Sequence, residues 1–345
     1  MRNEEIIAST YTTRLRAMTL ALALGGLLMA AKFVAYFITG SAAILSDAFE
    51  SIINVVASGF VLYSIYLSHQ PPDKSHPYGH GKIEYFAVGF EGALIILAAG
   101  AILYKAIPAF FQVRTIAKLD LGIVLVMGAS AVNLAMGIFL IRTGRKTRSA
   151  PLEADGKHLI TDVYTSVGVI IGLVLVKVTD WLWWDPLAAC AVAVNIVITG
   201  WHLVKKSFAR LMDEADPELL VRIVEILNKN RQPDWIDIHH LRTRYYGDKV
   251  HLDFHLVVPR SFSLHEAHME AKNIENMILD SLPEVAEVIV HVDPCEDPLC
   301  KRCQQYKCED RSQAKTASTT MWRVEEVVEK RVHQERILGG EHAGD

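Results

Sequence analysis

Two apolar segments of the sequence each carry a pair of polar residues that lie one helical turn apart. Glu50 and Asn54 are four residues apart in the first segment, and His158 and Asp162 are four residues apart in the second. Side chains at this spacing share one face of a helix. Two helices packed on these faces would surround one small cation with four ligands in tetrahedral fashion. Mixed nitrogen and oxygen donors suit Zn²⁺ and its first-row neighbours better than Ca²⁺ or Mg²⁺.

Ionisable groups within apolar helices indicate function, because each costs roughly 2.5–3.5 kcal/mol on membrane-insertion scales. Asp47 lies one turn before Glu50 and would compensate for the uncharged Asn54 as a further ligand, although aspartate is also a common helix N-cap. The alternative for the whole set is that these groups snorkel from the helix ends or pair with Lys32. Glu91, in another apolar segment, is expected to form a structural hydrogen bond or to face water.

The helices that must hold these residues are predicted to cross a membrane. Of the 345 residues, 51% are hydrophobic, and the long apolar runs end at about residue 205. A bilayer core needs about 20 mostly apolar residues per helix. Six segments qualify: 17–38, 43–67, 84–106, 120–142, 159–179 and 184–204. With the N-terminus inside, thirteen Lys and Arg residues lie on the inner side and four on the outer side, so both termini are predicted to be cytoplasmic.

The connection between the second and third predicted spans carries Asp73, His76 and His80. Pro77 and Gly79 exclude a helical pairing of the two histidines. A turn can still bring all three side chains onto one ion. The alternative is a pair of solvated loop histidines near the lipid headgroups.

After residue 210 the pattern changes to short elements. They are predicted in the order αββαβ, over residues 217–230, 235–244, 249–258, 264–281 and 286–292, which fits a small ferredoxin-like α+β domain. Apolar residues alternate with His and Asp in the last two strands, so one sheet face is apolar and the other is polar. His255, His291 and Asp293, with His239 nearby, have the ligand types for one or two Zn²⁺ ions. An ordinary solvated sheet face is the alternative.

Four cysteines follow in the spacing C-x₄-C-x₂-C-x₄-C: Cys295, Cys300, Cys303 and Cys308. A cytosolic cluster of four cysteines is more often a metal site than two disulfides, and the central pair is a good chelate. The outer spacings are unusual for a structural zinc finger. A reversible redox pair or simply free thiols are therefore the alternatives.

Several classes of protein do not fit the sequence. A net charge of −4 argues against a protein that binds nucleic acid by neutralising phosphates. His265 and His268 are three residues apart, whereas the helical zinc-protease motif needs a spacing of four. The chain also has no Gly-rich phosphate loop ending in Lys-Ser or Lys-Thr, which argues against an ATP-driven pump.

The whole pattern resembles the cation diffusion facilitator family, from about residue 10 to 295. Each motif is weak alone, but six motifs in order along six predicted spans are specific. They are Thr39-Gly40-Ser41 with Ile44-Leu45-Ser46-Asp47, His76-Pro77-Tyr78-Gly79-His80-Gly81-Lys82, His158-x-x-x-Asp162, Leu211-Met212-Asp213, His239-His240-Leu241-Arg242-Thr243-Arg244 and His291-Val292-Asp293-Pro294.

The resemblance implies a homodimeric exporter of divalent transition metals that is usually coupled to proton entry. By position, Glu50 and Asn54 match the family's two ligands in the second span, and the His-Asp pair matches its two ligands in the fifth. The loop around His76 matches an accessory metal site, and His268 matches a ligand that bridges at the dimer interface. Glu50 has a longer arm than the family's usual Asp or His, and Asn54 lacks the usual charge, so the metal stays open.

The expected fold is a membrane all-α domain of six transmembrane helices over residues 1–210. A cytoplasmic ferredoxin-like (αββαβ) α+β domain for metal binding and dimerisation over 211–294 and a Cys-containing tail over 295–345 are expected to follow it. The expected function is secondary active export of a divalent cation by proton antiport with alternating access, with Zn²⁺ first and Fe²⁺, Mn²⁺, Co²⁺, Ni²⁺ or Cd²⁺ behind it.

The expected partners are the metal cation, protons, membrane lipid and a second copy of the chain, without nucleic acid and without enzymatic activity. The short loops suit a bacterial inner membrane. Two alternatives remain open at this point. The first is a membrane metal sensor or scaffold with the same fold but no flux, which the amide of Asn54 keeps in play. The second is an intramembrane metalloenzyme, which would need an open coordination position and a general base.

Overall fold

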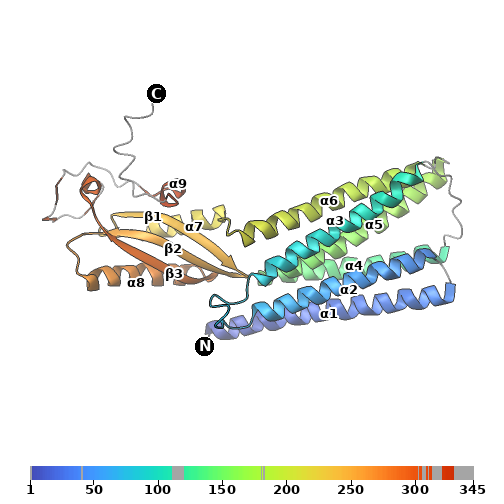
Figure 1. The fold of residues 1–345 in the computed structure, drawn as a ribbon, viewed down its shortest axis with the longest axis horizontal. Coiled ribbons are helices and arrows are strands. Elements are labelled where there is room, and N and C mark those ends of the chain that lie inside the picture. The colour runs from blue at the N-terminus through green and yellow to red at the C-terminus, as the bar shows by residue number, and fades with distance from the viewer. Residues whose placement is uncertain are drawn as a thin grey trace, which may run out of the picture. The chain divides into compact units, whose positions relative to one another are not determined.

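The computed structural model describes residues 2–39, 42–110, 120–179, 181, 183–301, 303–304, 308–309, 311–312 and 321–329. The chain divides into two compact units, Met1–Met212 and Asp213–Asp345. The first unit is built from helices, whereas the second contains the sheet (Figure 1).

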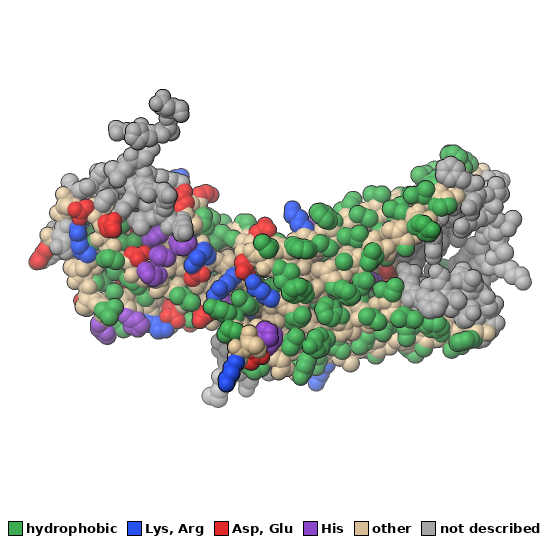
Figure 2. Space-filling model, viewed as in Figure 1, with side chains coloured by type: hydrophobic (Ala, Val, Ile, Leu, Met, Phe, Trp, Pro, Cys, Tyr) green, Lys and Arg blue, Asp and Glu red, His purple; other side chains and the backbone are tan. Residues whose placement is uncertain are grey.

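Six long helices make up the first unit: α1 (Arg2–Thr39), α2 (Ala42–Ser68), α3 (Ile83–Ala109), α4 (Asp120–Thr147), α5 (Ala150–Thr179) and α6 (Trp184–Leu211). Large apolar side chains such as Phe37, Leu97 and Tyr104 are exposed on them, and Figure 2 shows hydrophobic side chains over the visible face of this unit. Apolar surface on this scale marks contact with a membrane or a partner rather than with water. The six predicted spans thus correspond to six observed helices.

Five helices in the described part of the chain are long and apolar enough to cross a bilayer. Their apolar segments are Ser9–Val34, Ser51–Ser68, Ile83–Pro108, Met127–Thr147 and Pro186–Leu211. The first turns of the remaining helix, α5, carry Glu153, Asp155, Lys157 and His158. The polar beginning of α5 is therefore where this unit departs from a plain apolar bundle.

Two pairs of glycines let helices of the membrane unit approach closely. A Cβ atom added at Gly156 on α5 would lie 2.9 Å from the carbonyl oxygen of Gly137 on α4. One added at Gly92 on α3 would lie 2.9 Å from the carbonyl oxygen of Gly200 on α6. Because these positions lack side chains, α5 packs against α4 and α3 packs against α6. These contacts fix the helix backbones beside His158, which follows Gly156 by two residues.

Replacing Gly156 with alanine should destabilise the membrane unit, because the new methyl group would meet the α4 backbone and force the two helices apart. Overpacking of this kind typically costs about 1–3 kcal/mol. The melting temperature of the purified protein in detergent measures the effect. Gly100→Ala is the matched control, because no atom lies within 4 Å of the Cβ position there. Equal melting temperatures for the two variants would contradict the prediction.

The second unit contains a three-stranded sheet with two helices on one face. Its elements are α7 (Pro217–Lys229), β1 (Asp237–Tyr246), β2 (Lys249–Val258), α8 (Leu264–Ser281), β3 (Val285–Pro294), the 3₁₀ helix η1 (Asp297–Lys301) and α9 (Val324–Val327). The sheet order is β1-β2-β3, with β1 antiparallel and β3 parallel to β2. The predicted αββαβ order is confirmed, although β1 begins two residues later than predicted because Trp235 closes a turn on the carbonyl of Gln232.

The helix starts of this unit follow ordinary capping chemistry. The side chain of Asp216 accepts hydrogen bonds from the backbone of the first turn of α7, and Pro217 occupies the first helical position. Ser263 and Glu266 form a reciprocal capping box at the start of α8. These caps place α7 and α8 so that their apolar stripes pack on the sheet.

The two faces of the sheet differ as the alternation predicts. Leu252, Phe254 and Leu256 of β2 are buried against Ile274 and Ile278 of α8. The intervening residues of β2 are histidines and an aspartate on the opposite face. A bulge in β1 between residues 239 and 242 shifts the register there. As a result, His239 pairs with His255, and His255 pairs with His291, in one row across the three strands.

Candidate metal sites

Three of the four predicted membrane ligands meet between α2 and α5. The Nε2 atom of His158 lies 3.1 Å from Oδ1 of Asn54 and 3.9 Å from Oδ1 of Asp162. The Nδ2 atom of Asn54 donates a hydrogen bond of 3.0 Å to Oδ2 of Asp162. Because His158 is buried and the other two side chains are half-buried, the group can offer a nitrogen and oxygens to one small cation with little competition from water.

The fourth predicted ligand of this site, Glu50, and the additional candidate Asp47 lie on α2. Their side chains lie outside the described residues. Glu50 precedes Asn54 by one turn of the helix. Among the described contacts near this site, Nζ of Lys32 donates a hydrogen bond of 2.9 Å to the hydroxyl of Ser51.

A small cavity adjoins Asn54. It has a volume of about 50 Å³ and a mostly apolar lining, to which Lys32, Ser51, Asn54, Ser58 and Asn133 contribute polar side chains. A cavity of this size has room for a water molecule. The amide of Asn54 therefore lies between the cavity and the ligands on α5.

Two buried carboxylates lie beside His158. Glu91 on α3 has no exposed surface, and its Oε2 atom lies 2.9 Å from Nδ1 of His158. Asp155 on α5 is 2% exposed and accepts a hydrogen bond of 2.8 Å from Ser58 on α2. The structure thus realises the structural hydrogen bond expected for Glu91 and not the water-facing position. Sequence reasoning missed Asp155, although its position three residues before His158 on a helix was a signal.

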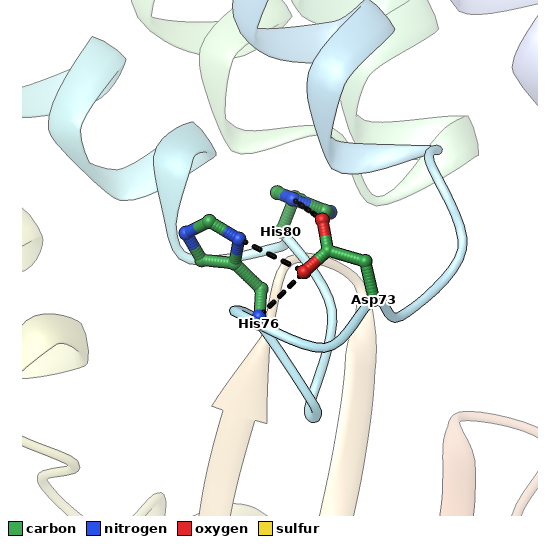
Figure 3. A group of neighbouring side chains, drawn as sticks. All are labelled: Asp73, His76 and His80. Atoms are coloured by element: carbon green, nitrogen blue, oxygen red, sulfur yellow. Dashed lines mark hydrogen bonds and ion pairs between the residues drawn. The ribbon is translucent and has the colours of Figure 1, made fainter.

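The loop between α2 and α3 brings Asp73, His76 and His80 together (Figure 3). The ligand atoms of all three lie within 4.8 Å of one another. Oδ1 of Asp73 is 3.3 Å from Nδ1 of His76, and Oδ2 is 3.3 Å from Nε2 of His80. The Ser75 hydroxyl and the backbone N–H of His76 donate to Asp73 and lower its pKa to about 2. The carboxylate is therefore ionised and ready to bind a cation throughout the physiological pH range.

The polar sheet face gathers His239, His255 and Asp293, whose ligand atoms also lie within 4.8 Å of one another. Oδ2 of Asp293 is 2.8 Å from Nδ1 of His255 and 3.8 Å from Nε2 of His239. His291 is more exposed, and its Nδ1 is 3.1 Å from Oδ1 of Asp293. His268 is exposed on α8, which covers the opposite face of the sheet. Within a single chain, His268 is therefore not a member of this group.

The tail cysteines occupy different environments. Cys300 and Cys303 are buried, whereas Cys295 and Cys308 are half-buried, and all four are free thiols. Burial raises the pKa of the Cys295 thiol, and the neighbouring Cys303 and Cys300 raise it further. Among the described residues, groups of at least three His, Cys, Asp or Glu side chains with ligand atoms within 4.8 Å of one another occur in the loop and on the sheet face, and neither group contains a cysteine.

A small apolar cluster joins the tail to the end of the sheet. Cys303 and Leu299 pack against Ile236 and Val257, with Cys295 alongside them. The backbone N–H of Cys295 also donates to the carbonyl of Val258 at 2.8 Å. Cys295 and Cys303 therefore pack against the residues where β1 begins and β2 ends.

Comparisons with known proteins agree with this architecture. Residues 18–212 match the family of cation efflux transmembrane domains, and residues 215–295 match the cytoplasmic domain of cation efflux proteins. The chain is 36% identical over 289 residues to an uncharacterized transporter of Synechocystis, covering 83% of this chain and 93% of the relative. It is 31% identical over 270 residues to the cation-efflux pump FieF of Shewanella oneidensis, covering 78% and 90%. It is also 30% identical over 305 residues to metal tolerance protein 2 of Oryza sativa, covering 80% and 77%.

The two matched domains coincide with the helical unit and the sheet unit of the structure. The family consists of transporters rather than enzymes, and it supports a metal cation as the substrate and a homodimer as the assembly. Five apolar helices among the described residues agree with an integral membrane protein. The chain belongs to the cation efflux family, also called the cation diffusion facilitator family.

Proposed function

We propose that this protein exports a divalent transition-metal cation, Zn²⁺ in the first place, from the cytoplasm across a bacterial inner membrane. Transport is secondary active and proceeds by proton antiport with alternating access. The observation that carries the proposal is the hydrogen-bonded group of His158, Asn54 and Asp162 between two helices of the membrane unit. These polar side chains join helices that otherwise expose apolar surface, which is typical of an ion pathway.

The proposed coupling follows from the chemistry of the ligands. A carboxylate or an imidazole must lose its proton before it binds a metal ion, so metal binding from the cytoplasm releases protons. The helices then rearrange and open the site to the outside, where protons bind the ligands and displace the metal ion. Glu50, with Asp162 and His158, would carry these protons, and Asp47 stays a candidate for an additional ligand on α2.

The other two groups are proposed as accessory and regulatory metal sites. Asp73, His76 and His80 would bind one ion in the loop. His239, His255, His291 and Asp293 would bind one or two ions on the cytoplasmic sheet face, with His268 contributed across the dimer interface. Metal at the sheet would tighten the dimer and bias transport, which is a coupling between distinct sites.

Flux in proteoliposomes tests the function directly. The purified protein is reconstituted in sealed vesicles with a pH gradient. Accumulation of Zn²⁺, Fe²⁺, Mn²⁺, Co²⁺, Ni²⁺ and Cd²⁺ is measured by elemental analysis of the vesicles, and a proton-sensitive dye follows the proton counterflow. Accumulation with proton counterflow supports the proposal, and the panel identifies the metal. Vesicles that bind metal but accumulate none of the six would support the sensor or scaffold instead.

The tail cysteines are proposed to bind one Zn²⁺ ion per chain, with Cys300 and Cys303 as the central chelate. Their joint replacement by serine should remove one bound metal ion per chain and leave export intact, because the tail lies outside the membrane unit. Metal content after purification, measured by mass spectrometry, is the readout. Cys190→Ser on α6 is the control, and unchanged metal content in the double variant would rule out this site.

Point substitutions are preferable to truncation in this experiment. Trp322 and Val327 of the tail are buried in the main core of the cytoplasmic unit. Asn228 on α7 holds the backbone of Trp322 through two hydrogen bonds of 2.9 Å. Deleting the tail would therefore damage that core as well as remove the cysteines.

A further inference from the structure

We infer that Glu91 is a positioning residue of the transport site, which rests on the proposed export function. Its carboxylate holds the imidazole of His158 through Nδ1, so that Nε2 is directed to the ligands on α2 and α5. Glu91 acts through His158 and is not itself one of the four proposed ligands. The inference adds a third helix, α3, to a site that the sequence places on two.

The geometry of the imidazole carries this inference. Nδ1 of His158 lies 2.9 Å from Oε2 of Glu91, whereas Nε2 lies 3.1 Å from Oδ1 of Asn54. Partners on both edges of the ring leave it little freedom to rotate. Because Oδ1 of Asn54 can only accept a hydrogen bond, Nε2 is the donor in this contact. If Nδ1 keeps the hydrogen that it donates to Glu91, loss of the hydrogen on Nε2 leaves that nitrogen with a lone pair for a metal ion.

The neighbouring carboxylate does not have this role. Asp155 lies on the same helix as His158, but its Oδ1 atom accepts a hydrogen bond from the hydroxyl of Ser58 on α2. Glu91 is therefore the carboxylate in hydrogen-bond contact with Nδ1 of His158. Its position is fixed by the backbone of α3, where Gly92 packs on Gly200 of α6.

Glu91 is unusual because its carboxylate is fully buried and only one of its two oxygens has a hydrogen-bond partner among the described residues. Its side chain has no exposed surface, and its Oε1 atom is buried without a hydrogen-bond partner among the described residues. A carboxylate buried in this way is costly unless a nearby positive charge or donor compensates for it. A metal-binding histidine supplies that compensation, because a carboxylate on its second nitrogen fixes the ring and raises its basicity toward the metal.

The charge of Glu91 also matters because of Asn54. An amide at that position leaves the site one carboxylate short of the family pattern described above. Glu91 places a negative charge one imidazole away from the cation, where it strengthens the His158 ligand without occupying a coordination position. Its loss should therefore weaken metal affinity more than it slows turnover.

Three variants of the full-length protein test the inference by Zn²⁺ uptake into proteoliposomes. Glu91→Ala should raise the KM for Zn²⁺ about 10–100-fold with a smaller change in kcat. Glu91→Gln keeps an acceptor for Nδ1–H but loses the charge, so its KM should lie between those of the wild type and Glu91→Ala. Glu84→Ala is the matched control, because Glu84 is a buried carboxylate on the same helix and binds Ser68 at 2.7 Å.

A merely structural role for Glu91 gives a different result. Glu84→Ala should lower the melting temperature without changing KM, and Glu91→Ala would then behave in the same way. A wild-type KM in folded Glu91→Ala overturns the inference. If Glu91→Ala does not fold, a wild-type KM in Glu91→Gln overturns it equally. Failure of the export function itself is distinguishable, because the wild-type vesicles would then accumulate no metal.

Discussion

Replacing Asp162 with alanine is expected to abolish metal export and to leave the protein folded. Asp162 is the proposed carboxylate ligand on α5. It accepts a hydrogen bond from Asn54 and lies 3.9 Å from the Nε2 atom of His158. Its loss removes one metal bond and one of the charges that offset the desolvation of a divalent ion. Zn²⁺ uptake into proteoliposomes should fall by more than about 100-fold. That factor is the largest loss typical of removing a residue that only hydrogen-bonds to a metal ligand.

A second variant at this position separates the effect of charge from that of shape, and a variant on α8 serves as the control. Asp162→Asn retains the size of the side chain and one hydrogen-bonding oxygen, and it should lose export almost as fully because the charge is gone. Asp280→Ala changes an exposed carboxylate on α8 and should transport normally. Wild-type flux in Asp162→Ala would refute the site between α2 and α5.

Asn54→Asp is expected to raise the affinity for Zn²⁺ about tenfold or more, which corresponds to about 1.4 kcal/mol. In the structure, the amide of Asn54 donates a hydrogen bond of 3.0 Å to Asp162. An aspartate there would place two carboxylates side by side, and their repulsion would destabilise the metal-free state. A divalent ion removes this repulsion and gains a second charged ligand. Isothermal titration calorimetry in detergent measures the affinity.

Melting curves provide a second measurement for the same variant. Asn54→Asp should melt lower than the wild type without metal and gain more from Zn²⁺, because a ligand that binds the folded state stabilises it in proportion to its affinity. Asn54→Ala is the control that removes the amide without adding charge, and it should bind Zn²⁺ more weakly. An unchanged metal profile in both variants would mean that residue 54 is not a ligand.

The parts of this protein that could be predicted from sequence are those governed by local spacing. Helical periodicity placed Asn54 on one face of α2, and it placed His158 and Asp162 on one face of α5. Strand alternation separated the apolar residues of β2 from His251, Asp253 and His255. In each case, one short element decides which residues share a face.

Contacts between distant elements could not be predicted in the same way. Glu91 and His158 are 67 residues apart, and the face of α3 that meets α5 depends on the packing of Gly92 against α6. The position of the tail could not be predicted either. The spacing of its cysteines does not indicate that Trp322 packs in the core of the sheet unit. His268 lies on the helix side of the sheet, so its proposed role depends on a second chain.

The bulge in β1 determines which face of the sheet His239 occupies. His239 and Arg242 are an odd number of residues apart, yet both pair with the polar side of β2, opposite His255 and Asp253. The extra residue of a bulge leaves the strand ladder incomplete, and here the backbone N–H of His240 donates instead to the carbonyl of Glu329 at 2.7 Å. The last described segment of the chain is thus hydrogen-bonded to the bulge of β1. Without the extra residue of the bulge, the strand before it would shift by one residue, so His239 would face the apolar core of this unit and leave the histidine row.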